Sequence, residues 1–389
     1  MNMALKNSVL INWPGQIVDR LVLGPDTRMP ILRQVDAPVT SMSVRSRVSV
    51  VIPCHNYGRF LSECVQSVLD QQGVDVEVII VDDASTDESR AVATRFASHD
   101  DRVRVVQHDT NTGFVAAFND GLKYAEGDFI VRLDADDLLT AGSLARSAGL
   151  LQAFPSVGLV YGHPLHFTSD VPTHFETLVD SWTVWSGDVW LSARCQQAVN
   201  CITSPEAVIR ASVLESIGPL RGELSVAPDM EMWLRAAAVS DVGRVNGPDQ
   251  AFHRDHSASL TAAADYDVLG DLVERQAVFE VFFSDPNLRL PNRDLLREAA
   301  SRTLARHGLD RACREFDRGT RDLAAVDQYV AFAFGVYPRA TMLEEWAELR
   351  RRISVGARWS RWVPSFFFHA VVRRMREKRW YARWERTGV

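Results

Sequence analysis

Short apolar runs alternate along this chain with segments whose apolar residues recur at helical spacing. The runs are rich in β-branched residues, as buried strands are, and cover residues 48–52, 77–81, 103–106, 129–133 and 157–161. Helical patterns lie between them, for example over residues 60–69, 113–125 and 144–154. Strands that alternate with helices predict βαβ units around a largely parallel sheet, and therefore an α/β fold.

The remaining segments have a different texture. Residues 1–46 contain four prolines and no sustained period, which indicates an irregular N-terminal extension. Strand patterns fade after Asp265, and prolines at 286, 291, 338 and 364 are expected to divide a helical C-terminal part into short helices. We therefore predict three parts: 1–46, 47–264 and 265–389.

The composition is that of a globular protein of 389 residues, with 46% hydrophobic and 24% charged residues. These values exclude disordered and collagen-like chains, and no apolar run approaches the ~20 residues that cross a bilayer. Five scattered cysteines without a C-x-x-C pair indicate reduced thiols, and no secretory cleavage pattern is present, so we expect a cytoplasmic protein. A net charge of −7 argues against nucleic acid as a partner.

The charge is unevenly distributed. Residues 351–389 carry a net +9 and the rest of the chain −16, and Trp359, Trp362, Phe367 and Trp384 are interspersed among the basic residues. Two interpretations stay open. This end either packs its aromatic side chains on the acidic body, or lies as an interfacial helix on anionic lipid at the inner face of the membrane.

Polar residues follow three of the predicted strands. Because ligands bind outside the carboxyl ends of parallel strands, these residues are expected to converge on one crevice. Asp134-x-Asp136 follows the fourth strand, and two carboxylates at this spacing can share a hydrated Mg²⁺ or Mn²⁺. The alternative is an acidic turn in which Asp137 caps the next helix.

The second strand ends at Asp82-Asp83, followed by Ser85 and Thr86. A carboxylate here can accept the imide N–H of uracil, and one of the two hydroxyl residues is expected to cap the next helix. His55 and Asn56, after the first strand, are either site residues or turn residues that follow Pro53.

These motifs, in this order, resemble the inverting family 2 glycosyltransferases, which have the GT-A fold. The resemblance covers residues 47–260 and rests on V-S-V-V-I-P-C-H-N-Y at 48–57, V-D-D-A-S-T-D at 81–87, N-T-G at 111–113, N-D-G at 119–121, L-D-A-D-D at 133–137, D-M-E-M-W-L-R at 229–235 and H-R-D-H at 253–256. The ordered set is specific, although no single motif is. It implies a Rossmann-like, mostly parallel sheet flanked by helices.

The resemblance also implies residue roles. The residues that it places at the nucleotide of the donor are Pro53, His55, Asn56, Asp83, Asn111 and Asp134. It assigns Asp136 and His256 to a divalent metal, Mg²⁺ or Mn²⁺, and Asp229 to the general base. Two positions depart from the family pattern: Pro228 stands where Glu often precedes the base, and Phe118 stands where Arg is common, with Arg132 as its candidate replacement.

The implied reaction moves a sugar, with inversion, from a nucleotide diphosphate donor, most simply a UDP-sugar, to a hydroxyl of a glycan, lipid-linked or small-molecule acceptor. Trp182, Trp185 and Asn200 are candidates for the acceptor side, with core packing the equal alternative for the tryptophans. A non-catalytic nucleotide-sugar-binding protein and another nucleotide-sugar enzyme remain alternatives, and a homodimer is left open.

Overall fold

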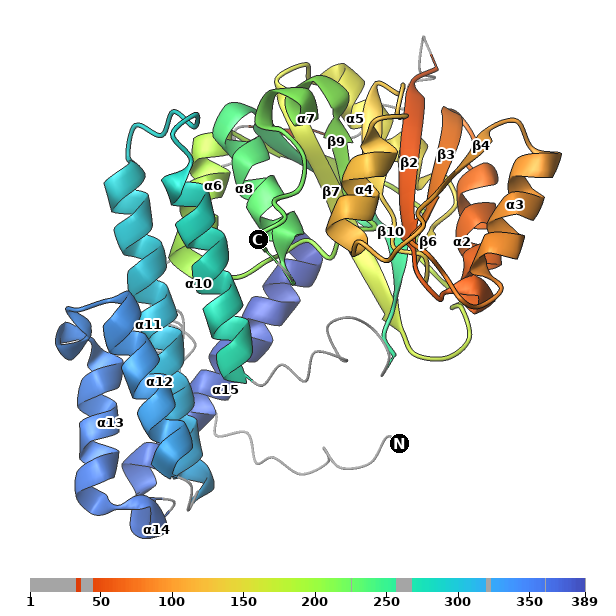
Figure 1. The fold of residues 1–389 in the computed structure, drawn as a ribbon. Helices are drawn as coiled ribbons and strands as arrows, with labels where there is room; N and C mark the ends of the chain where they lie inside the picture. Colours follow the sequence, from red (N-terminus) through yellow and green to blue (C-terminus); the bar gives the residue numbers. More distant parts are fainter. Residues whose placement is uncertain are drawn as a thin grey trace.

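The computed structural model describes residues 33–35, 45–224, 226–256, 268–319, 323–360 and 362–388. It confirms the predicted α/β fold: a mostly parallel sheet flanked by helices is followed by a helical region (Figure 1). The predicted boundary at residue 264 and nearly all of the N-terminal extension lie outside the described residues.

One sheet contains all ten strands of the described part of the chain, in the order β1-β8-β10-β7-β9-β5-β2-β3-β4, with β6 paired to β10. The strands are β1 (Arg33–Val35), β2 (Arg47–Cys54), β3 (Asp75–Asp82), β4 (Val103–Gln107), β5 (Phe129–Arg132), β6 (Leu138–Leu139), β7 (Val157–Phe167), β8 (Ser181–Trp185), β9 (Val208–Arg210) and β10 (Asp241–Arg254). The five strands expected from the sequence are present as β2, β3, β4, β5 and β7.

The pairing directions bring the carboxyl ends of β2, β3, β4, β5, β7 and β10 to one edge of the sheet. β2 is parallel to β3 and β5, and β3 is parallel to β4. β9 runs antiparallel between β5 and β7, so β5 and β7 point the same way, and β10 is parallel to β7. The strand ends at which the sequence predicts the site therefore lie along one edge, from β4 across the sheet to β10.

The helices of the described residues cover both faces of the sheet and form the C-terminal region. They are α2 (Gly58–Leu69), α3 (Ser89–His99), α4 (Phe114–Leu122), α5 (Ser143–Ala153), α6 (Gly187–Gln197), α7 (Ala211–Ile217), α8 (Pro228–Val239), α10 (Val268–Ser284), α11 (Arg293–Arg318), α12 (Leu323–Val336), η1 (Ala340–Met342), α13 (Glu344–Val355), α14 (Ala357–Ser360) and α15 (Pro364–Thr387).

Central strands are apolar on both faces because helices bury both. Val51 and Ile79 belong to the cluster that contains Phe118 of α4, whereas Val50 and Ile80 pack in the cluster that contains Leu61 of α2. Phe118, at the position where the related family often has Arg, is therefore a core residue with 1% exposure.

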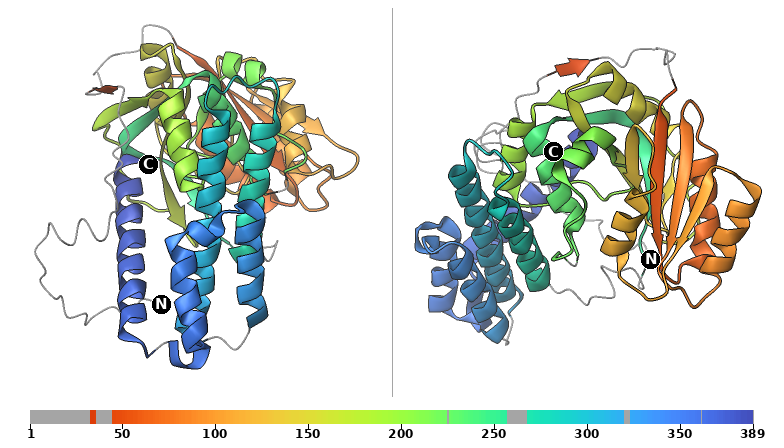
Figure 2. Two further views of the ribbon diagram at one scale, coloured as in Figure 1. Left: turned by 90° about the vertical axis from the view of Figure 1, so that its left-hand side faces the viewer. Right: turned by 45° about the horizontal axis from the view of Figure 1, so that its top comes forward.

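The helical region differs from the expected short helices. The prolines do fall between helices or at their first turn, but α11 runs for 26 residues and α15 for 24. α10, α11 and α15 lie roughly side by side below the sheet (Figure 2).

α15 returns to the sheet at its C-terminal end. Arg244 of β10, 2% exposed, donates to the carbonyl oxygens of Glu385 and Arg386 at 2.9 and 2.8 Å, and the Tyr161 hydroxyl donates to the Gly388 carbonyl at 3.0 Å. Gly388 has φ +73°, and a Cβ there would lie 2.3 Å from Cδ of Arg244, so this position requires glycine. We call these contacts the C-terminal clamp.

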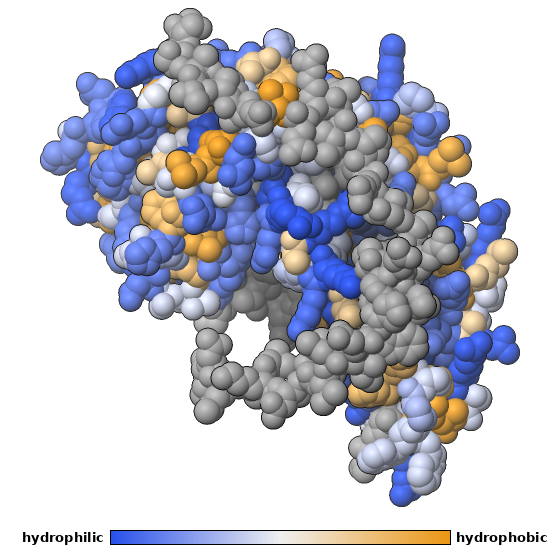
Figure 3. Space-filling view, turned by 180° about the vertical axis from the view of Figure 1, so that it is seen from behind, coloured by the Kyte–Doolittle hydropathy of each residue, from blue (hydrophilic) through white to orange (hydrophobic). Residues whose placement is uncertain are grey.

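The coloured part of the face seen in Figure 3 is largely hydrophilic, with separate apolar patches. None of the helices in the described residues combines the length and the apolar character needed to cross a bilayer. Trp359 of α14 and Phe367 of α15 are large hydrophobic side chains that are 60% and 68% exposed.

Candidate functional site

The turns after β2 and β3 are bound to each other through Asn56. Asn56 has φ 60°, a left-handed conformation that asparagine tolerates, and its Oδ1 accepts the backbone N–H groups of Thr86 and Asp87 at 2.8 and 3.3 Å. His55 Nδ1 donates to the Asp83 carbonyl oxygen at 2.6 Å. Both predicted nucleotide residues therefore also hold the two turns together.

The expected helix cap at Ser85 or Thr86 is wrong. α3 begins at Ser89, and the Ser89 N–H and hydroxyl both donate to Asp87. The Ser85 hydroxyl accepts from the Asn56 N–H at 3.1 Å instead. The contacts between the two turns therefore use Ser85 and Thr86, the residues that the sequence pattern assigned to the cap of α3.

Asp83 organises the loop after β4. Its Oδ1 accepts from His108 Nδ1 and from the backbone and hydroxyl of Thr112, and its Oδ2 accepts from the Gly113 N–H, all within 2.9 Å. Burial alone would raise the pKa of Asp83, but these hydrogen bonds outweigh it and lower the pKa. Asn111 lies on the same loop, where its Oδ1 accepts the Gly113 N–H.

Asp136 and His256 meet at the end of β5. His256 Nε2 lies 2.7 Å from Asp136 Oδ2, and both side chains are only slightly exposed. Burial, followed by the charge of Asp134, raises the pKa of Asp136, whereas His256 lowers it. A carboxylate oxygen and an imidazole nitrogen this close are donors that a divalent ion accepts together, so these residues fit the implied metal.

Asp137 does not cap a helix, contrary to the alternative considered from the sequence. It precedes the short strand β6, is 1% exposed, and accepts the Arg254 N–H at 2.9 Å and His253 Nδ1 at 3.0 Å. Burial raises the pKa of Asp137, and Asp137 in turn raises the pKa of His253. Asp137 therefore fixes the end of β10 beside the end of β5.

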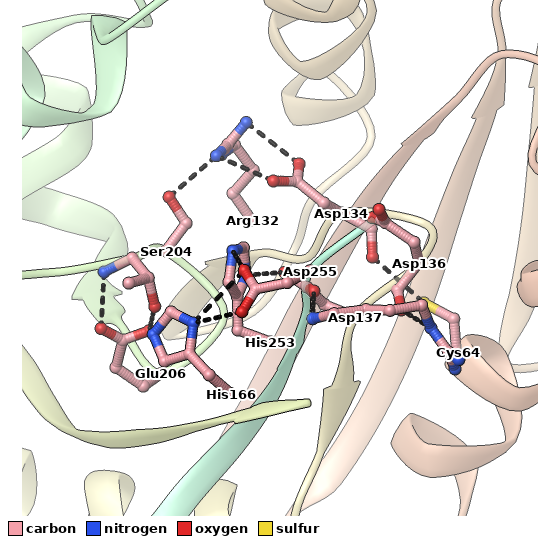
Figure 4. Close-up of polar contacts among 12 residues, drawn as sticks. Cys64, Arg132, Asp134, Asp136, Asp137, His166, Ser204, Glu206, His253 and Asp255 are labelled. Atoms are coloured by element: carbon pink, nitrogen blue, oxygen red, sulfur yellow. Dashed lines mark hydrogen bonds and ion pairs between the residues drawn. The ribbon is translucent and has the colours of Figure 1, made fainter. Parts of the chain in front are cut away.

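A chain of polar contacts connects Asp134 to Asp229. Arg132 binds both carboxylate oxygens of Asp134 at 3.1 Å and donates to the Ser204 hydroxyl at 2.8 Å (Figure 4). The Ser204 hydroxyl donates to Asp229 Oδ2 at 3.1 Å. Arg132 is 8% exposed, so its charge acts on both carboxylates with little screening.

Asp229 lies in the first turn of α8, directly after Pro228. Proline suits the first helical position, and the departure at Pro228 therefore does not prevent Asp229 from being presented on the helix. Burial raises the pKa of Asp229, with Arg132 the main opposing influence. Asn200, predicted on the acceptor side, donates to the same Oδ2 at 3.3 Å.

The predicted tryptophans lie in the core. Trp182 and Trp185 belong to β8 and are 7% and 1% exposed, so their burial favours the packing interpretation over an acceptor wall. Pro53 is also buried, inside β2, where it pairs with Val81 of β3.

Sequence reasoning missed two residues that position the site. Ser204 has φ 108°, a strained conformation for serine, and joins Arg132 to Asp229. Arg254 donates to the Asp136 carbonyl at 3.0 Å and lies over the ring of Phe60. Arg254 lies within the H-R-D-H motif, which could have indicated its role, whereas no sequence motif around Ser204 indicated that it belongs to the site.

Comparison with protein families matches residues 49–218 to "Glycosyl transferase family 2". Glycosyltransferase GlyG of Streptococcus pneumoniae is 40% identical over 92 residues, which are 24% of this chain and 31% of GlyG. The uncharacterized protein MT1568 of Mycobacterium tuberculosis is 28% identical over 250 residues, 61% of this chain and 76% of that protein. The chain thus spans about a third of the length of GlyG.

Solved structures show the same fold at low identity. Residues 1–349 of Staphylococcus aureus TarS, in complex with UDP-GlcNAc, superpose with a TM-score of 0.55 at 18% identity, over 81% of this chain and 91% of that one. The mannosyltransferase PcManGT of Pyrobaculum calidifontis, in complex with GDP-Man and Mn²⁺, gives 0.51 at 20% identity, over 92% and 93%. The predicted GT-A fold is confirmed.

Proposed function

We propose that the chain, in which residues 49–218 match the glycosyltransferase family 2 model, transfers a sugar from a nucleotide diphosphate donor to an acceptor hydroxyl with inversion. The observation that carries the proposal is the arrangement around Arg132, which binds Asp134 directly and reaches Asp229 through the Ser204 hydroxyl. Asp136, which pairs with His256, lies two residues beyond Asp134. TarS and PcManGT bind UDP-GlcNAc and GDP-Man, which supports a nucleotide-sugar donor.

The donor base is expected to lie at the turns after β2, β3 and β4, next to His55, Asn56 and Asn111. Oδ1 of Asp83 already accepts three hydrogen bonds from the described residues, whereas Oδ2 accepts only that of Gly113 from the same part of the chain. Oδ2 can therefore accept a further N–H, such as the imide of uracil, and UDP is the favoured nucleotide. The Asp83 side chain is 3% exposed, so the loop with Asn111 must shift to admit the base.

The diphosphate is expected near Asp134, Asp136 and His256. Mg²⁺ or Mn²⁺, held by Asp136 and His256, would act as a Lewis acid that neutralises charge on the leaving diphosphate. Arg132 adds a fixed positive charge on the side of Asp134 that faces Ser204, and it keeps Asp134 oriented through two hydrogen bonds.

Asp229 is our candidate for the general base that takes the proton of the acceptor hydroxyl. Its Oδ2 accepts hydrogen bonds from the Ser204 hydroxyl and the Asn200 side-chain amide, which fix the orientation of the carboxylate. Glu231, two residues later, is fully buried and paired with Arg235, so it is not accessible to an acceptor. Inversion follows if Asp229 and the leaving group lie on opposite sides of the anomeric carbon.

Binding of UDP measured by calorimetry tests the donor site. Wild-type protein with Mn²⁺ is expected to bind, and both EDTA and Asp136→Ala are expected to weaken binding by at least ~10-fold, as the loss of metal-site residues typically does. Asp101→Ala, an exposed aspartate in the turn before β4, is the matched control and should bind as wild type does. Equal affinity in all samples would contradict the metal-dependent site.

A turnover assay separates an enzyme from a non-catalytic nucleotide-sugar-binding protein. We expect release of nucleoside diphosphate from the donor that gives the largest thermal shift with Mn²⁺. Tight donor binding without any release, with glycan, lipid-linked and small-molecule acceptors in turn, would favour the non-catalytic alternative.

We also propose that the aromatic tip contacts an anionic membrane. We define this tip as the exposed side chains Trp359, Trp362, Phe367 and Phe368 on α14, α15 and the turn between them. Arg374 supports the proposal, because it is exposed and lines a pocket together with Phe367, so its charge is available to an anionic surface. Basic residues near an anionic leaflet contribute ~1 kcal/mol each.

Co-sedimentation with vesicles that contain phosphatidylglycerol tests this surface. Full-length protein is expected to pellet at low salt and to dissociate at high salt, because screening weakens the attraction. The double variant Trp362→Ser and Phe367→Ser should bind more weakly, whereas Leu178→Ser, which removes an apolar side chain of 77% exposure from the sheet domain, should not. Substitutions are preferable to truncation because α15 is part of the C-terminal clamp. Protein that stays in the supernatant at low salt would refute the contact.

A further inference from the structure

Three metal-binding side chains converge where β7 and β10 end. His166 of β7 stands directly opposite His253 of β10, and the Asp255 N–H donates to the Phe167 carbonyl at 2.8 Å, which holds Asp255 beside them. Figure 4 shows the three side chains pointing toward one another, between Glu206 and Asp137. None of the three belongs to the donor site proposed above.

The distances suit one shared ion. His166 Nδ1 lies 3.2 Å and His253 Nε2 lies 3.9 Å from the Asp255 carboxylate, and the ligand atoms of all three residues lie within 4.8 Å of one another. Metal bonds to imidazole nitrogen and carboxylate oxygen are ~2.0–2.2 Å long, so atoms separated by these distances can surround a single cation.

The ring of His253 is already oriented as that of a metal ligand. Its Nδ1 faces Asp137 Oδ2 at 3.0 Å, and Asp137 is 1% exposed and anchored by the Arg254 N–H. Histidine ligands usually donate the second ring N–H to a carboxylate in this way, which leaves the other nitrogen for the metal. Here that other nitrogen, Nε2, is the atom that faces Asp255.

The cluster is separate from the Asp136–His256 pair. Residues that alternate along an extended segment point to opposite sides, so His253 and Asp255 face one way while Arg254 and His256 face the other. Arg254 contacts the Asp136 carbonyl and His256 contacts the Asp136 carboxylate, on that other side. One short segment, the H-R-D-H motif, therefore contributes residues both to this cluster and to the Asp136–His256 pair.

We propose that His166, His253 and Asp255 form a second divalent cation site, at the ends of β7 and β10. Two imidazoles and one carboxylate favour an ion of the Zn²⁺ class over Mg²⁺, which prefers oxygen ligands. Three protein ligands leave at least one coordination position for water or an anionic group. His166 and Asp255 are 42% and 51% exposed at their side chains, so that position is open to solvent.

Binding of Co²⁺ to metal-free protein, followed by its visible absorption and by calorimetry, tests the site without any donor or acceptor. Asp136→Ala removes the proposed donor metal site and is expected to keep one equivalent of bound Co²⁺. His166→Ala and Asp255→Asn, each made in the Asp136→Ala background, are expected to lower that affinity by at least ~10-fold. His99→Ala, an exposed histidine of α3 that contacts only its own helix, is the matched control.

The results distinguish this site from the donor site. If Asp136→Ala alone abolishes Co²⁺ binding, or if both cluster variants bind as their parent does, the second site is refuted. Melting temperatures in EDTA should be equal for parent and variants, because His166 and Asp255 are half-exposed and their loss leaves the core unchanged. Loss of UDP binding by Asp136→Ala with Co²⁺ binding retained would support both sites independently.

Discussion

Replacing Asp229 by asparagine should remove the proton acceptor and leave the site otherwise intact. Asp229 Oδ2 accepts hydrogen bonds from Ser204 and Asn200, and the amide oxygen of an asparagine can accept the same two. The side chain keeps its volume and its place in the first turn of α8. Donor affinity is therefore expected to be unchanged, whereas the rate should fall.

The expected size of the effect follows from the role of the base. A positioned general base contributes typically ~10²–10⁴-fold, which corresponds to about 2.7–5.5 kcal/mol of activation free energy. The pH dependence adds a second test. Burial raises the pKa of Asp229, so the acid limb of kcat/KM should lie above the ordinary aspartate value of about 3.9, with the rate rising as Asp229 loses its proton. In Asp229→Asn that limb should be absent.

Release of nucleoside diphosphate, measured at saturating donor over a range of acceptor concentrations from pH 4 to 9, gives both kcat and kcat/KM for the acceptor and provides the assay. Glu223→Gln is the matched control, because Glu223 is an exposed carboxylate in the segment that leads to α8 and should keep wild-type kcat. A value of kcat for Asp229→Asn within a few-fold of wild type, or an unchanged acid limb, would refute the assignment. Loss of activity in Glu223→Gln would move the base to that residue.

Two further predictions concern stability. Arg244→Met leaves the Glu385 and Arg386 carbonyls without their buried donor, which costs about 1–3 kcal/mol of folding free energy for each unsatisfied group. The urea midpoint of unfolding should therefore fall. Arg374→Met, on the exposed face of α15, should leave the midpoint unchanged. The pKa of Asp83 is lowered on folding. The contribution of Asp83 to stability is therefore complete above about pH 4 and is lost as the pH falls through the pKa of the folded state. Asp83→Asn should lose less stability than wild type between about pH 4 and about pH 2, and equal losses would contradict this.

Much of the sheet domain follows from local sequence signals. β2, β3 and β5 are short apolar runs that end in polar residues, and the rule for parallel strands placed those ends at one edge. Predicting the position of Asp136 in the site and its contact with His256 also required the family resemblance, because the two residues are 120 positions apart. Periodicity alone does not determine which distant segments meet.

The remaining differences have physical causes. Ser85 and Thr86 resemble helix caps, but Asn56 binds their segment from another turn, and α3 starts later. From the sequence alone, Trp182 and Trp185 are candidates for sugar binding. They lie on β8, a strand that the sequence pattern did not predict. Tertiary contacts therefore override local preference at these positions.

The C-terminal clamp has a consequence for the order of folding. Its hydrogen bonds join residues 141 to 227 positions apart, so they close very large loops, and contacts of high sequence separation tend to form late. During synthesis, β7 and β10 leave the ribosome long before α15. Until α15 has been made, the guanidinium of Arg244 lacks its carbonyl hydrogen-bond partners. The sheet domain is thus vulnerable to proteases and to aggregation for the time that it takes to make the segment from β10 to α15, and the arrival of α15 ends that interval.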